Sequence, residues 1–435
     1  MRYVPHTKEE IKAMLEAVGL RNVDELFSDI PTEALLKRHL QVEGGWDEEQ
    51  LRAYFRKAAS GIPDANSAVY FLGGGVYDHY VPSAVDKIIA LPEFYTAYTP
   101  YQAEISQGTL QAMFEYQSLI CELTGMEVAN GSLYDGASAV AEAVLMAMRI
   151  NGKRRVLVSE CMHPDIIEVL RTYQLGQDFE ILTLPQKEGV TDLSELEDLS
   201  NVSCLVMQNP NYYGFLENMT QASALIHTAG GLFVAAVDPL SLGVLKSPHE
   251  YGADVVVGEG QSLGNHISYG GPHFGFFATK MDYIRYMPGR MAGQTVDVDG
   301  RVGYVLTLQT REQHIRREKA TSNITSNHWL MALASAVYLS LMGGSLPELG
   351  QTILNRSTYL AQKLASVGYP LWQRQYFFKE FPIKARDAEA VQEALADSGY
   401  YVGPVIDEHT LLVAVTEKRT KEHMDKLIEL MEGLR

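Results

Sequence analysis

Residues 254–275 read DVVVGEGQSLGNHISYGGPHFG, a buried strand followed by a glycine-rich loop around which the rest of the chain is organised. The β-branched residues Val255 to Val257 predict a fully buried strand. The glycine-rich segment that follows ends in Gly270-Gly271-Pro272, a strong turn signal. Open α/β sheets present their sites where buried strands run into loops at the carboxyl edge. The stretch therefore predicts a site at that edge.

A second buried strand, Leu232–Val237, ends in Asp238. In enzymes that use pyridoxal 5'-phosphate on such a sheet, an Asp at one strand end pairs with the pyridinium nitrogen, and a Lys beyond a later strand forms the Schiff base. Here Gln261 stands where that lysine belongs. Lys246 precedes the Val255–Val257 strand, and Lys280 follows the last predicted strand, Phe274–Ala278. Both are therefore poor substitutes.

Composition favours an ordinary soluble globular protein with one large and one smaller domain in its 435 residues. The net charge of −18 disfavours nucleic acid and anionic membranes as partners. Three cysteines in apolar surroundings, without metal-ligand spacing, indicate a reducing compartment and no metal site. With no targeting segment and no run of membrane-spanning length, we expect a cytoplasmic protein.

Strands and helices alternate from residue 126 onward, which predicts a mostly parallel, doubly wound sheet. The seven candidate strands are Met126–Ala129, Val156–Ser159, Glu180–Leu184, Val202–Met207, Leu232–Val237, Asp254–Val257 and Phe274–Ala278. Three domains are expected: a helical N-terminal arm (1–70), whose first helix begins at Thr7, a large α/β domain (71–327) and a small α+β domain (328–435).

Three polar residues follow strands at the same predicted edge. Ser138 opens a helix whose N-terminus suits a phosphate, although an ordinary Asp-Gly turn explains it nearly as well. His163 precedes a helix-starting proline and is placed to stack on a flat ring, or it is a simple cap. The Asn211 amide is placed to reach a phenolic oxygen. Their succession at one edge, rather than any one of them, favours a cofactor pocket.

Two further loops are candidates for an interface. Gly74 and Gly75 belong to a glycine triplet that permits close backbone approach, or they form a plain turn; no strand is expected before them. Tyr95, Tyr98, Thr99 and Tyr101 form an aromatic loop that either reaches into a shared site or is a surface patch.

The chain resembles the glycine decarboxylase P-protein family, specifically the subunit 1 (alpha) branch of its two-subunit form. The resemblance spans nearly the whole chain and rests on Tyr3-Val4-Pro5-His6-Thr7, the Tyr95–Gly108 loop, the Gly258–Gly275 loop and the highly specific string Leu308–Asn323. One small departure follows that string, at Thr325-Ser326-Asn327-His328.

The resemblance implies a type I pyridoxal-phosphate fold with a small C-terminal α+β domain. It also implies an α2β2 assembly in which subunit 2 carries the Schiff-base lysine, binds the cofactor and, with this chain, decarboxylates glycine. The aminomethyl group then passes to the lipoyl arm of the H-protein and CO2 is released. In this chain the aromatic loop and the two glycines become candidates for the shared site. A relict pocket would comprise Ser138, His163, Asn211, Asp238 and Gln261.

Two alternatives stay open at this point. One is a self-sufficient pyridoxal-phosphate aminotransferase or lyase that uses one of the lysines set aside above. The other is a purely structural or regulatory subunit with no residue in the chemistry.

Overall fold

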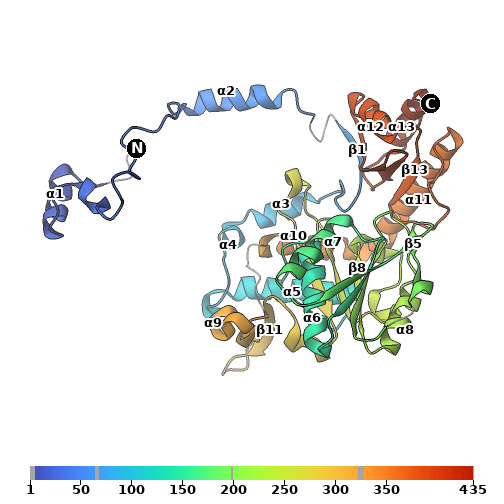
Figure 1. The fold of residues 1–435 in the computed structure, drawn as a ribbon, viewed down its shortest axis with the longest axis horizontal. Coiled ribbons are helices and arrows are strands. Elements are labelled where there is room, and N and C mark those ends of the chain that lie inside the picture. The colour runs from blue at the N-terminus through green and yellow to red at the C-terminus, as the bar shows by residue number, and fades with distance from the viewer. Residues whose placement is uncertain (1–4, 64–67, 197–198, 322–327, 435) are drawn as a thin grey trace. The chain divides into compact units, whose positions relative to one another are not determined.

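A computed structural model describes residues 5–63, 68–196, 199–321 and 328–434 (Figure 1). Its internal contacts divide it into two compact units, residues 1–62 and 63–435. Tyr3 and Val4 of the first family motif lie outside the described residues. So do residues 322–327, which include the end of the string from Leu308, most of the departure and the predicted domain boundary at 327.

The first unit contains two helices and a 3-10 turn, α1 (Lys8–Ala17), η1 (Val23–Phe27) and α2 (Glu48–Ala59). Helix α1 begins where the sequence predicts, because the Thr7 side chain accepts a hydrogen bond from the Glu10 N–H and the Glu10 carboxylate accepts one from the Thr7 N–H. No described residue of these three elements is buried within this unit.

The second unit is built on a mostly parallel sheet of seven strands, as predicted, and their order is β2-β10-β9-β8-β7-β3-β4. Only β10 runs antiparallel to its neighbours, β9 and β2. The strands are β2 (Val128–Ala129), β3 (Arg155–Ser159), β4 (Glu180–Leu184), β7 (Val202–Asn209), β8 (Leu232–Val237), β9 (Val255–Glu259) and β10 (Gly275–Thr279).

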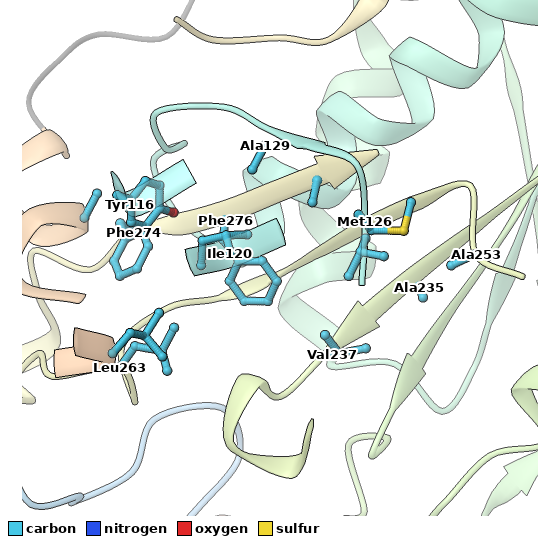
Figure 2. Close-up of a cluster of buried hydrophobic side chains, with 14 of the residues drawn as sticks. Tyr116, Ile120, Met126, Ala129, Ala235, Val237, Ala253, Leu263, Phe274 and Phe276 are labelled. Atoms are coloured by element: carbon cyan, nitrogen blue, oxygen red, sulfur yellow. The ribbon is translucent and has the colours of Figure 1, made fainter. Parts of the chain in front are cut away.

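Helices cover both faces of this sheet, because its strands are apolar on both sides. In β8, Val234 and Ala236 pack with α6 (Gly136–Asn151) and α7 (Pro164–Leu175). Phe233, Ala235 and Val237 face the opposite core, which contains α5 (Gln107–Thr124), α8 (Met219–Thr228) and α10 (Trp329–Met342). Figure 2 shows part of that core, where Tyr116 lies edge-on to Phe274.

A separate C-terminal core surrounds the three-stranded sheet β13-β16-β15. Its elements are α11 (Leu346–Ser366), β13 (Glu380–Lys384), α12 (Ala388–Asp397), β14 (Tyr400–Gly403), β15 (Val405–Asp407), β16 (Thr410–Ala414) and α13 (Lys421–Gly433). A strand, β1 (Val69–Leu72), does precede the glycine triplet, contrary to expectation. It pairs in parallel with β14, a partner too distant in sequence for local pattern to reveal.

The remaining elements connect these layers. They are α3 (Ser83–Ile89), α4 (Pro92–Tyr95), the small hairpins β5 (Gln186–Lys187) with β6 (Val190–Thr191) and β11 (Met291–Val296) with β12 (Val302–Thr307), and α9 (Gln313–Arg316).

Among the described residues one helical stretch, Trp329–Ser366, is long and apolar enough to cross a membrane by length and composition alone, contrary to the expectation of no run of that length. It consists of α10 and α11, separated by a 3-10 turn at Gly343–Ser345. Trp329 and Tyr338 are buried in the same core as the large sheet, and Leu360 in the C-terminal core. The apolar character of the stretch is therefore explained by packing inside this unit.

Candidate functional site

A cavity of about 270 Å³ lies at the carboxyl edge of the large sheet. Strands β8 and β9 end in its wall, the first turn of α6 forms one side, and the glycine triplet closes another. Its lining residues include Gly74, Gly75, His163, Asp238 and Gln261 from the sequence prediction. The two glycines thus lie on this chain's own pocket.

Two other predicted residues, Ser138 and Asn211, are not among those that line the cavity. The Ser138 N–H donates to the Asp135 carboxylate, which caps α6, at 2.7 Å. Asn211 is buried in the loop after β7, where its amide N–H group donates to the Gly189 carbonyl and to Glu217, each at 2.8 Å. These bonds give both residues a structural place beside the pocket.

The N-terminus of α6, where a phosphate is expected, holds a carboxyl group of this chain. Glu259, the last residue of β9, accepts hydrogen bonds from the Gly136 N–H at 3.0 Å and the Gln261 N–H at 3.1 Å. A Cβ atom at residue 136 would lie 2.8 Å from the Glu259 nitrogen, so this close approach requires Gly136. Burial raises the pKa of Glu259 to about 8, against the lowering effect of the backbone donors.

Asp238, expected to face a pyridinium nitrogen, is paired with a lysine of this chain. One carboxylate oxygen accepts a hydrogen bond from the Leu240 N–H at 3.0 Å. The other forms an ion pair with the ammonium group of Lys379, which lies directly before β13. The Lys379 side chain is only 1 % exposed, so this pair is held inside the protein.

The Lys379 ammonium has two further neighbours. It lies 3.3 Å from the centroid of the Tyr77 ring and 3.3 Å from Nε2 of His79. Nδ1 of His79 is 2.8 Å from Glu417. The two ring nitrogens of His79 therefore link the Lys379 ammonium to the Glu417 carboxylate.

The next residue, Glu380, is also buried and fixes the glycine triplet. It accepts hydrogen bonds from the Gly74 N–H at 2.9 Å and from the Tyr77 hydroxyl at 2.6 Å. Burial raises the pKa of Glu380 to about 7, and burial together with the Glu380 charge holds the pKa of Tyr77 well above its ordinary value.

Gln261, predicted to stand at the position of the Schiff-base lysine, uses both ends of its side-chain amide in hydrogen bonds. Its amide oxygen accepts from the Tyr77 N–H at 3.1 Å, and its NH2 group donates to the Tyr77 carbonyl at 3.1 Å and the Asn265 carbonyl at 2.7 Å. A lysine cannot accept the bond from Tyr77. Gln261 therefore ties the segment after the glycine triplet to the end of β9.

His163 is held in the wall rather than left free. Its Nε2 lies 2.8 Å from the Gly74 carbonyl, and its Nδ1 accepts from the Asp165 N–H at 3.1 Å. The Tyr212 ring stands edge-on to it, with centroids 5.0 Å apart. Both ring nitrogens are thus occupied by the backbone of this chain.

The aromatic loop contributes none of the residues that line the cavity. Tyr95 and Tyr98 are 68 % and 76 % exposed. The Tyr101 hydroxyl donates to the Glu312 carboxylate at 2.7 Å and accepts from Arg290 at 2.9 Å, which anchors the end of the loop. The loop therefore presents two tyrosines outward from a fixed base.

The sequence analysis did not identify Glu259, which lines the cavity, or Lys379 and Glu380, which bind the lining residues Asp238, Gly74 and Tyr77. The available signal was a charged pair, Lys379-Glu380, inside the apolar run from Phe377 to Ile383, since charges in such a run are buried only with partners. Glu259 likewise follows three buried valines. Neither pattern names the partner, because each partner lies on a different element.

The residues at this pocket do not fit pyridoxal 5'-phosphate. The amide of Gln261 cannot condense with an aldehyde, Asp238 already faces an ammonium group, and Glu259 covers the helix N-terminus. The sheet, its crossover helices and the position of Asp238 nevertheless define a protein of the type I pyridoxal-phosphate class.

Comparison with known proteins gives the family within that class. The sequence model of the family described as glycine cleavage system P-protein matches residues 1–431 of this chain. The chain therefore belongs to the glycine cleavage system P-protein family, which confirms the resemblance.

Individual relatives agree with this assignment. The chain is 99 % identical over 435 residues to the probable glycine dehydrogenase (decarboxylating) subunit 1 of Coprothermobacter proteolyticus, with both chains fully covered. It is 48 % identical over 443 residues to the protein of that name from Carboxydothermus hydrogenoformans, again with both fully covered.

Solved structures confirm the fold. A crystal structure of glycine decarboxylase (P-protein) of the glycine cleavage system, in inhibitor-bound form, superposes with a TM-score of 0.92 at 45 % identity, with 100 % of each chain covered. A sphingosine-1-phosphate lyase from Burkholderia pseudomallei shares the fold at a TM-score of 0.67 and 14 % identity, over 92 % of this chain and 93 % of that one.

Proposed function

We propose that this chain is the subunit of glycine decarboxylase that does not anchor the cofactor and that works only with a second subunit. The observation that carries the proposal is the set of contacts at the cavity: Gln261 offers no amine, Lys379 pairs with Asp238, and Glu259 covers the N-terminus of α6. The relatives are named as a subunit 1. That name supports a partner that supplies the missing lysine.

In this proposal the two subunits together decarboxylate glycine and pass the aminomethyl group to the lipoyl arm of the H-protein, releasing CO2. Pyridoxal 5'-phosphate, held by subunit 2, supplies the electron sink for decarboxylation. An α2β2 heterotetramer and a cytoplasmic location complete the proposal.

The test of this proposal is a labelling and reconstitution experiment. We expect the purified chain, incubated with pyridoxal 5'-phosphate and reduced with borohydride, to carry no stoichiometric phosphopyridoxyl-lysine, because Gln261 offers no amine. Glycine–bicarbonate exchange should appear only after subunit 2 is added. A stoichiometric label on one lysine of this chain, or exchange by this chain alone, would instead support a self-sufficient enzyme.

Lys379 is the lysine to inspect in that experiment, since it is the one that contacts Asp238. Its position argues against a Schiff base. In pyridoxal 5'-phosphate the ring nitrogen and the aldehyde lie on opposite sides of the ring. An amine in direct contact with the carboxylate that should meet the nitrogen is therefore at the wrong end of the ring.

The contribution of this chain to the chemistry is assigned to the aromatic loop. Tyr95 and Tyr98 are exposed, and Tyr101 fixes the base of the loop through Glu312 and Arg290. A tyrosine offers an apolar ring that excludes water and a hydroxyl that orients a small substrate. Because glycine has no side chain to hold, walls of this kind suit it, and we place the loop against the active site of subunit 2.

Replacement of Tyr98 by phenylalanine tests the role of the loop. The change removes one hydroxyl and keeps the ring, so a lost hydrogen bond of about 0.5–3 kcal/mol would slow exchange by roughly twofold to a hundredfold. Assembly with subunit 2, checked by light scattering, should be unchanged. Tyr95→Phe is tested in parallel.

Tyr376→Phe is the matched control, since Tyr376 is also highly exposed but lies far from the loop in sequence, before β13. If both loop variants and their alanine counterparts catalyse exchange at the wild-type rate, the loop has no role in the chemistry and serves only as an interface surface. That result would favour the purely structural subunit.

A further inference from the structure

Two groups of this chain lie at the two points where pyridoxal 5'-phosphate is normally held: Glu259 lines the cavity, and Lys379 is paired with Asp238, which lines it. Glu259 lies on the first N–H group of α6, the position that suits a phosphate, and it bonds both Gly136 and Gln261. Lys379 presents an ammonium group to Asp238, where a pyridinium N–H would lie. When ionised, Glu259 is negatively charged like the phosphate, and Lys379 is positively charged like the pyridinium.

The charges around the cavity add to this exclusion. The described residues that line it include four acidic side chains, Asp135, Asp165, Asp238 and Glu259, and neither lysine nor arginine. A phosphate dianion that entered would lose water and meet carboxyl groups instead of donors, which is unfavourable in a partly enclosed site.

We propose that Glu259 and Lys379 are internal substitutes for the phosphate and the pyridinium of the cofactor, and that they exclude it independently of Gln261. In consequence, restoring a lysine at residue 261 does not by itself restore a cofactor site. This inference does not depend on the proposed role in glycine decarboxylation, because it concerns only the pocket of this chain.

The first experiment compares the single variant Gln261→Lys with the triple variant Gln261→Lys, Glu259→Ala, Lys379→Ala. Cofactor binding is followed by equilibrium dialysis, and the labelled residue is identified by borohydride reduction and peptide mass spectrometry. We expect the triple variant to bind pyridoxal 5'-phosphate at least tenfold more tightly than the single variant, with the label at residue 261. Equal affinity of two folded variants would overturn the proposal.

A second experiment needs only one substitution and no cofactor. Glu259→Ala uncovers the N–H of Gly136, so the variant should gain a site for inorganic phosphate. We expect its melting temperature to rise with phosphate concentration by more than that of the wild-type chain, as for any ligand that binds only the folded state. Potassium chloride at matched ionic strength controls for salt.

The control variant is Lys246→Met, which alters an exposed lysine that does not line the cavity. It should respond to phosphate as the wild-type chain does. A Glu259→Ala protein that folds but shows no extra response to phosphate would mean that Glu259 does not cover an anion site, and the proposal would fail.

Discussion

Replacing Lys379 with methionine is expected to destabilise the protein by about 3–5 kcal/mol, the usual consequence of breaking a buried ion pair from one side. Methionine keeps most of the side-chain volume, so the loss reports on charge rather than on a cavity. The Asp238 carboxylate, whose side chain is 14 % exposed, would then lack its cationic partner. The measurement is the midpoint of denaturant unfolding followed by circular dichroism.

A second substitution distinguishes this cause from general damage. In the Lys379→Met background, Asp238→Asn removes the stranded charge and keeps the bond from the Leu240 N–H, so most of the lost stability should return. Lys280→Met is the matched control. Lys280 is 34 % exposed and pairs with Asp254, which keeps His227 and the Phe233 N–H as partners.

We expect Lys280→Met to cost about 1 kcal/mol or less, as for a partly exposed pair. A Lys379→Met loss no larger than that of Lys280→Met, or no recovery with Asp238→Asn, would show that the Lys379–Asp238 pair is not an important stabilising contact. The contacts of Lys379 at the pocket would then contribute little to the stability of the fold.

The largest effect on assembly is expected from helix α2 of the N-terminal unit. Its residues Leu51, Tyr54 and Phe55 follow helical spacing on one face and are all exposed, and Trp46 packs edge-on against Tyr54 with ring centroids 5.0 Å apart. Exposed apolar surface of this kind marks a protein–protein contact. We place it against subunit 2.

Substitution of Leu51, Tyr54 and Phe55 by alanine should weaken the complex with subunit 2 at least a hundredfold. Each of these side chains can contribute roughly 1.5–3 kcal/mol when fully buried, and aromatic residues dominate binding energies at interfaces. The measurement is the dissociation constant by calorimetry. The N-terminal unit should remain helical by circular dichroism, because no described residue of α2 is buried within that unit.

The control lies on the polar face of the same helix, where Arg52 forms an exposed ion pair with Glu48 at 2.9 Å. Arg52→Ala should leave the affinity within a few-fold of wild type. If the apolar triple variant binds as tightly as Arg52→Ala, the N-terminal unit is not part of the interface.

The large sheet could be predicted from the sequence, because its strands are short, mostly apolar segments that alternate with helical ones. All seven predicted strands pair in that sheet, and Asp238, which follows β8, lines the cavity. The sequence also shows that residue 261 is not a lysine. This inference needs only the residue type, since an amide cannot form the Schiff base expected at that position.

The contacts among the side chains around the pocket could be found only from the tertiary structure. Glu259 meets Gly136 across 123 residues of sequence, and Glu380 meets Tyr77 across 303. Sequence patterns report which face of an element is apolar, but they do not report which buried charge meets which partner, because that depends on how distant elements pack. For the same reason β1 was not predicted, since its strand conformation depends on pairing with the distant β14. The lack of a lysine at residue 261 can be seen in the sequence, whereas the pairing of Lys379 with Asp238 can be seen only in the structure.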